Sequence, residues 1–196
     1  MSIALTHRTT LVDRFVPKSL IADIVLVLAG TALTAVAAQL QVAIPGNPVP
    51  FTFQTLAVLL VGSVLGTVRG ALSLALYAVL GTFLPIYTNH TSGVDHLFGA
   101  TGGYIVSFVV ASAVVGFLAE KGWSSQIFKM IASYVVGTAI IYGIGASWLT
   151  YQVLGGDWTK GLALGVTPFL IWDVVKAIIA GALVPAGWSL AKLLKK

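Results

Sequence analysis

Six apolar runs, separated by short polar segments, constrain the fold of this chain more than any other feature of its sequence. They span about residues 20–42, 52–68, 71–86, 101–119, 129–150 and 165–190. A helix needs about 20 apolar residues to cross the hydrocarbon core of a bilayer. Only 9% of the residues are charged, against about 25% in a typical soluble domain. The sequence therefore predicts an all-α integral membrane protein with six transmembrane helices, in one membrane domain over residues 1–196 that starts with a cytoplasmic segment, 1–19.

The second and third runs are shorter than the others and are joined by Arg69-Gly70. We expect these two helices to form a tight hairpin that tilts or reaches only part of the way across the bilayer.

The basic residues predict the orientation of the chain. With both termini in the cytoplasm, the inner segments hold nine of the eleven, which are Arg8, Arg14, Lys18, Arg69, Lys121, Lys129, Lys192, Lys195 and Lys196. Lys160 lies in an outer loop and Lys176 lies within a span. Because inner loops are enriched in Lys and Arg, we expect a multi-pass protein of the plasma membrane with both termini inside. Anionic lipid at the inner surface accounts for the net charge of +5, so this charge does not indicate nucleic-acid binding.

One acidic and one basic residue lie within the last apolar run. Asp173 and Lys176 are three residues apart, so a helix places them on one face. A charge at membrane depth costs roughly 2.5 to 3.5 kcal/mol even on the gentler insertion scale, so such residues usually face a bundle interior or an aqueous cavity. Either the two residues neutralise each other and tie the sixth helix to its neighbours, or they form a ligand-binding site that offers one anion and one cation.

Two outer segments carry backbone features that fit a pocket near this pair. Residues 44–52 contain three prolines, which fix φ and remove amide donors, so we expect an extended, semi-rigid flap that acts as a lid. Residues 98–104 lead with three glycines into the fourth helix, whose exposed amides and positive dipole end can hold an anion. Asp173 lies about eight residues from the outer end of its helix, or roughly 12 Å. The three features therefore converge on the outer half of the bundle.

Small residues form a stripe on two of the predicted helices. Gly62, Gly66 and Gly70 are spaced by four, which lets helices approach closely in lipid, and we expect this series to pack inside the bundle. The stripe on the first helix comprises Gly30, Thr31, Thr34, Ala35 and Ala38. For that stripe, internal packing and docking of a partner subunit are both open.

Several kinds of site are missing from the sequence. There is no Gly-Lys dipeptide, hence no phosphate-binding loop of the ATPase type, and there is no cysteine. No Ser and His are arranged as in a hydrolase, so we expect no enzyme activity and no catalytic residue. His90 and His96 share a short outer loop with Asp95. A metal site is one interpretation of this group, but we expect solvated imidazoles and no metal.

Four segments resemble the BioY family, the biotin-binding S components of energy-coupling factor (ECF) transporters. They are NPVPFTFQTLAVLL at 47–60, GALSLALY at 70–77, TGGY at 101–104, and Asp173-x-x-Lys176-Ala177. The resemblance covers nearly the whole chain. It implies a six-helix bundle of the ECF S-component type, with a biotin pocket near the outer surface. It also implies a transmembrane T component and two ATPases as partners, with biotin as the transported ligand and no cofactor.

The chain departs from the family pattern at three places. The family usually has Pro-Gly-Asp before the lysine of the sixth helix, whereas this chain has Ile171-Trp172-Asp173. An arginine sometimes found after Gly-Gly-Tyr is Ile105 here, and the loop at 88–93 is not rich in glycine. Alternatives are therefore an S component for another vitamin or small carboxylate, and a structural membrane subunit that binds nothing.

The chemistry of biotin suits the predicted pocket. Its carboxylate could be held by Lys176 or by the amides of residues 101–104, and Asp173 could accept from the ureido N–H groups. The loop at 88–93 and several aromatic or apolar side chains would complete the site. The predicted substrate-binding residues are Asp173, Lys176, Tyr104, Gly102, Gly103, Thr91, Asn89, Val49, Phe51, Tyr87 and Trp172.

Overall fold

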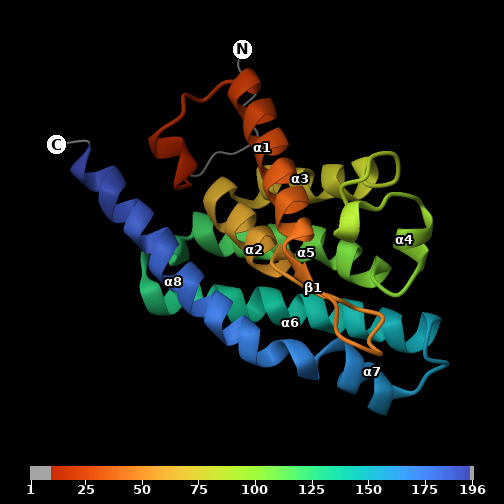
Figure 1. Ribbon diagram of the computed structural model, residues 1–196. Coiled ribbons are helices and arrows are strands. Elements are labelled where there is room, and N and C mark those ends of the chain that lie inside the picture. The colour runs from red at the N-terminus through yellow and green to blue at the C-terminus, as the bar shows by residue number, and fades with distance from the viewer. Residues whose placement is uncertain (1–9, 195–196) are drawn as a thin grey trace.

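The computed structural model describes residues 10–194, and the chain is mainly helical over this range (Figure 1). Its long helices are α1 (Leu20–Gln39), α2 (Gln54–Leu65), α3 (Thr67–Leu80), α5 (Gly102–Glu120), α6 (Ile127–Gln152) and α8 (Leu170–Leu193). The short elements are η1 (Val12–Arg14), η2 (Thr88–His90), α4 (Asp95–Phe98), η3 (Trp123–Ser125), α7 (Trp158–Gly165) and η4 (Thr167–Phe169). Strands β1 (Gln41–Val42) and β2 (Phe51–Thr52) pair antiparallel.

The six predicted spans correspond to the six long helices, and the prediction of a multi-pass, all-α membrane bundle is confirmed. Within the described residues, α1, α5, α6 and the stretch Trp158–Leu193 are long and apolar enough to cross a bilayer. Helices α2 and α3 have 12 and 14 residues, so each is only about 20 Å long. That length is short of the roughly 30 Å of a hydrocarbon core, as the sequence led us to expect.

The bend between α2 and α3 lies at Gly66 and not at the predicted turn, Arg69-Gly70. Gly66 has φ 89°, a left-handed value that suits glycine, and α3 starts at the next residue. Gly62 and Gly70 both lie against Ser112 of α5, so close that a Cβ on either would clash. The glycine series therefore packs inside the bundle, as predicted.

The last predicted span, residues 165–190, begins at the final residue of α7 and continues through η4 and α8. Pro168 lies inside η4, and proline both removes an amide donor and restricts the residue before it, which ends a helix. Helix α8 consequently begins only at Leu170, so Asp173 lies in its first turn. This places the predicted charged pair close to the outer loops.

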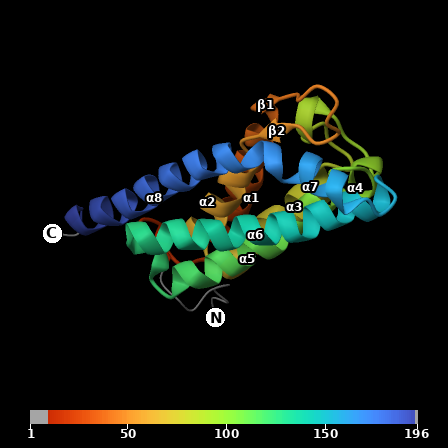
Figure 2. The ribbon, with the colours of Figure 1, turned by 90° about the horizontal axis from the view of Figure 1, so that it is seen from below.

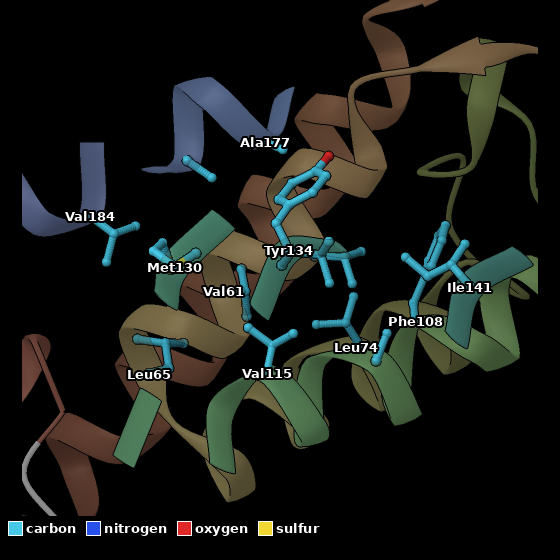
Figure 3. Close-up of a cluster of buried hydrophobic side chains, with 14 of the residues drawn as sticks. Val61, Leu65, Leu74, Phe108, Val115, Met130, Tyr134, Ile141, Ala177 and Val184 are labelled. Atoms are coloured by element: carbon cyan, nitrogen blue, oxygen red, sulfur yellow. The ribbon is translucent and has the colours of Figure 1, made fainter. Parts of the chain in front are cut away.

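A hydrophobic core joins α2, α3, α5, α6 and α8. Figure 3 shows Leu74, Val115 and Met130 gathered between the helices, all fully buried. The hydroxyl of Tyr134 projects from this cluster toward the Ala177 side of the core in Figure 3. Beyond this core, α5, α6 and α8 also contribute residues to a pocket.

The small stripe on α1 is also packed inside the chain. A Cβ at Gly30 would clash with Ser73 of α3, and the Thr31 hydroxyl donates to the Ser73 carbonyl at 2.9 Å. Thr34 and Ala38 are fully buried, and Ala35 is half-buried. Of the two roles left open for this stripe, the contacts with α3 agree with internal packing, and docking of a partner stays a prediction.

The two ends of the bundle are built differently. At one end the residues around η1 approach α3 and α8, where Asp13 pairs with Arg69 and Arg14 lies over Trp188. Figure 2 shows the end of α8 projecting on this side, while α4, α7 and the β hairpin lie at the other. The predicted inner basic residues Arg8, Lys195 and Lys196 lie outside the described range.

Candidate functional site

A pocket lies at the end of the bundle that carries α4, α7 and the β hairpin. It has an empty volume of about 620 Å³, part of which is open to solvent. Its lining residues belong to α2, α3, α5, α6, η4, α8, the hairpin and the connection between α3 and α5. Figure 1 shows where the main helices lie relative to one another. The lining residues are Val49, Pro50, Thr52, Gln54, Thr55, Tyr77, Tyr87, Thr88, His96, Thr101, Tyr104, Ile105, Phe108, Tyr142, Phe169, Asp173 and Lys176.

The predicted pair on α8 lines this pocket. Lys176 Nζ lies 3.0 Å from Asp173 Oδ1, and both side chains are at least 93% buried. Lys176 also donates to the Thr55 hydroxyl at 2.7 Å and to the Thr52 carbonyl at 3.0 Å. Its ammonium lies 4.5 Å from the centre of the Phe51 ring, within reach of a cation–π interaction. The pair is thus tied to β2 and to the start of α2, more than 110 residues earlier in the chain.

Asp173 has further donors around it. The Tyr142 hydroxyl of α6 donates to Asp173 Oδ2, and the Thr55 hydroxyl lies 3.4 Å from Oδ1. Tyr142 stacks on Phe169, whose ring lies 6.5 Å away, centre to centre. Residues from three helices therefore fix the orientation of a carboxylate that faces the pocket.

The proline-rich segment forms the loop of the β1–β2 hairpin and covers one side of the pocket. Val49 and Pro50 line the pocket from this loop. The Asn47 side chain donates to the Leu164 carbonyl of α7 at 2.8 Å and accepts from the Val49 amide at 2.9 Å. The loop is thus anchored to α7 across the mouth of the site, which agrees with the lid predicted from its prolines.

The connection between α3 and α5 forms another wall of the pocket. Tyr87 is buried, donates to the Ala78 carbonyl at 2.6 Å, and contacts the His96 ring at 5.4 Å between ring centres. The Gln39 side chain of α1 holds this connection, because it donates to the carbonyls of Ile86 and Tyr87. Hydrogen bonds from α1 therefore hold this wall in place, although the wall is part of a loop.

Five of the predicted binding residues line the pocket, namely Val49, Tyr87, Tyr104, Asp173 and Lys176. Tyr104 donates to the Gly165 carbonyl at 2.8 Å, so its hydroxyl joins α5 to the end of α7. The sequence placed these five residues correctly, and their roles in binding stay predictions.

The other six predicted residues lie outside the lining. Gly102 and Gly103 pack against Leu97 and Trp148, with no room for a Cβ. Phe51 is buried behind Lys176, whereas Trp172 packs on Phe51 with 55% of its surface exposed. Asn89 is exposed, and the hydroxyl of Thr91 is bonded to the Thr88 carbonyl. The sequence predicted that these residues lie near the pocket, but not whether their side chains point into it.

Sequence reasoning missed several lining residues, above all Thr55, Tyr142 and His96. Thr55 and Tyr142 belong to apolar helices in which nothing singles them out, and only the contacts with α8 reveal them. His96 was expected to be solvated. It instead faces the pocket because α4, a single helical turn, presents it toward Tyr87.

A second buried charge cluster lies at the opposite end of the bundle. Arg69 donates to Asp13 Oδ1 at 2.7 Å and to Asp23 Oδ1 at 2.6 Å, and all three side chains are at least 98% buried. Burial raises the pKa of Asp13, but hydrogen bonds from the Thr10 backbone and from Arg69 outweigh it and hold the pKa below its usual value. None of the three residues lines the pocket described above.

Comparisons with known proteins agree with this geometry. A family model described as the BioY family matches residues 7–193. A biotin transporter BioY from Thermotoga maritima is 40% identical over 151 residues, which cover 76% of this chain and 86% of the relative. A probable biotin transporter BioY from Pyrococcus horikoshii is 38% identical over 159 residues, which cover 81% and 91% of the two chains.

A solved structure has the same fold. It is the crystal structure of the S-component for biotin from an ECF-type ABC transporter, and it superposes with a TM-score of 0.75 at 24% identity. The match covers 90% of this chain and 92% of that one. The overall arrangement of the helices is therefore shared with this structure.

Proposed function

This chain belongs to the BioY family, and on that premise we propose that it is the biotin-capturing S component of an ECF-type uptake transporter. The observation that carries the proposal is the buried Asp173–Lys176 pair, which faces a pocket of about 620 Å³ under the hairpin loop. The pocket combines apolar and aromatic walls with a few fixed polar groups, as small-molecule sites do. Biotin has matching parts, an apolar bicycle, ureido N–H donors and a carboxylate.

The lining supports capture of a whole small molecule. Phe108 and Phe169 supply apolar surface, while Asp173 offers an acceptor for neutral N–H donors. Burying a polar group is costly unless it is hydrogen-bonded, so a ligand with donors in the right place is favoured over a purely apolar one. The proposed activity is binding and release, without chemistry on the ligand.

We further propose the setting in which the protein works. It would lie in the plasma membrane with both termini cytoplasmic, so that the pocket faces outward. Its sequence has no phosphate-binding loop, so energy for uptake would come from partners, a T component and two ATPases. The relatives that match along most of this chain are described as biotin transporters.

Titration of the purified protein with biotin tests the binding proposal. We expect saturable one-to-one binding in detergent or nanodiscs, measured by calorimetry, and no binding of lipoic acid, a carboxylic acid without a ureido ring. Saturable binding of another vitamin with no response to biotin would instead identify an S component of different specificity. A chain that binds none of them would be a structural subunit.

A second measurement tests the need for partners. The protein reconstituted alone in liposomes should bind biotin but neither hydrolyse ATP nor accumulate biotin when ATP is added. ATP hydrolysis by the pure chain would contradict the proposal.

A further inference from the structure

The side chain of Lys176 has no donor left for a ligand. An ammonium group carries three N–H donors. In this structure there is an acceptor for each of them, Asp173 Oδ1 at 3.0 Å, the Thr55 hydroxyl at 2.7 Å and the Thr52 carbonyl at 3.0 Å. Its positive charge is also matched by the adjacent carboxylate. A ligand carboxylate could bind Lys176 only by displacing one of these partners.

Asp173 is in the opposite situation, because it still has room to accept. An ionised carboxylate has about four acceptor sites. Oδ1 receives Lys176 and Thr55, and Oδ2 receives the hydroxyl of Tyr142. One site on Oδ2 remains for a neutral N–H donor such as a ureido group. A ligand carboxylate, in contrast, would be repelled by Asp173.

The wall formed by the α3–α5 connection holds polar groups without protein partners. The side chains of Thr88, His96 and Thr101 all line the pocket. Within residues 10–194, none of these three side chains has a hydrogen bond or ion pair to the protein. An imidazole offers at least one N–H donor in every protonation state, and each hydroxyl offers one more. Among the residues of this connection that line the pocket, His96 is the one with a basic side chain.

We propose that His96 recognises the carboxylate of the ligand, with Thr88 and Thr101 as neighbouring donors, while Asp173 receives the ureido group at the other wall. The proposal rests on the proposed function and adds the direction in which the ligand lies. Lys176 is then a positioning residue that holds Asp173, Thr52 and Thr55 in place. The arrangement differs from the expectation that Lys176 or the amides of residues 101–104 hold the carboxylate.

Affinities for biotin and for biotin methyl ester test this inference, because the ester keeps the ureido ring and loses the charge. The key variant is His96→Phe, which keeps a flat ring against Tyr87 and removes the donors. A hydrogen bond to a charged group corresponds to about tenfold or more in affinity. We expect His96→Phe to lower the affinity for biotin by about tenfold and to change the affinity for the ester little. The ratio of the two affinities should therefore approach one. His96→Gln keeps an N–H donor, so its affinity for biotin should fall less than that of His96→Phe.

His90→Asn is the matched control. His90 lies on the same connection but is exposed, does not line the pocket, and has φ 54°, a conformation that asparagine tolerates. We expect wild-type affinity for both ligands in this variant. Melting temperatures of all variants in detergent identify any loss caused by unfolding.

Lys176→Gln separates the two possible carboxylate sites. If Lys176 only positions Asp173, this variant should weaken biotin and its ester by similar factors. The inference would be overturned if Lys176→Gln lowered the affinity for biotin but not for the ester, and if His96→Phe left the ratio of the two affinities unchanged. Biotin binding itself would still be established. Failure of the wild-type protein to bind biotin would overturn the proposed function as well.

Discussion

The two buried charge clusters of this protein are alike in composition and different in surroundings. At the end that holds η1, which is the inner end in the orientation proposed above, Arg69 lies between Asp13 and Asp23, within 2.7 Å of each. At the outer end, Lys176 lies 3.0 Å from Asp173 and both line a pocket. The inner cluster joins η1, α1 and α3, whereas the outer pair joins α8 to α2 and the hairpin. Both would look like functional sites if buried charge were the only criterion.

The difference is in what remains for a ligand. No residue of the inner cluster lines the outer pocket, and its charges are paired within the protein. The outer pair leaves an acceptor on Asp173 that faces empty space. A buried charge therefore shows only that the protein must supply a partner for it. A ligand site also needs a pocket and a hydrogen-bond acceptor that the protein has not used.

The largest expected effect comes from breaking the inner cluster. Arg69→Leu removes the guanidinium that donates to both Asp13 and Asp23, and removal of one partner from a buried pair typically costs about 3 to 5 kcal/mol. We expect a large fall in melting temperature with biotin affinity of the remaining folded protein unchanged. Lys160→Gln serves as the control, because its pair with Asp157 is exposed and an exposed ion pair contributes little to stability. Loss of affinity in a stably folded Arg69→Leu protein would show that the two ends are coupled.

The next effect concerns ligand affinity at the outer pair. Asp173→Asn removes the charge that strengthens a hydrogen bond from the ureido group, and such bonds contribute about 1.5 to 3 kcal/mol. Biotin affinity should fall by about tenfold or more. The measurement is calorimetric titration alongside melting temperature.

The double variant Asp173→Asn, Lys176→Gln then tests whether the pair is a brace or a site. It removes both charges, so any stability lost in the single variants should return, while the affinity should stay low. Near-normal affinity in the single variants, with stability restored in the double variant, would make the outer pair a brace like the inner one.

The smallest effect is a change in the acid sensitivity of the inner cluster. The folded-state pKa of Asp13 lies below its usual value of 3.8, so Asp13 contributes stability above that pH and loses it as the pH falls through the folded pKa. Asp13→Asn should lower stability near pH 7 by about 1 to 2 kcal/mol, because Arg69 keeps Asp23. It should also reduce the fall in melting temperature between pH 5 and pH 3. Equal acid sensitivity in the variant and wild type would rule out this contribution.

Much of the site's location could be predicted from the sequence. The spacing of Asp173 and Lys176 put both on one helix face, and the prolines at residues 45, 48 and 50 indicated the flap. These inferences succeed because helix periodicity and proline geometry act within a few residues. The turn at Arg69-Gly70 was wrong, and the role of the small stripe on α1 stayed open, for the complementary reason. Whether a helix face meets α3 or a partner, and which glycine bends the chain, depends on how helices pack.

By itself the sequence determined the membrane class, the six helices and the presence of a charged pair that required partners, since hydrophobicity and the cost of charge in lipid are properties of local composition. Only the tertiary structure decided which partners were used. Thr52 and Thr55, more than 110 residues earlier in the chain, accept hydrogen bonds from Lys176. His96 lines the pocket from α4, a single helical turn. Hydrogen bonds act over about 3 Å, so their capacity can be counted only after distant segments have come together.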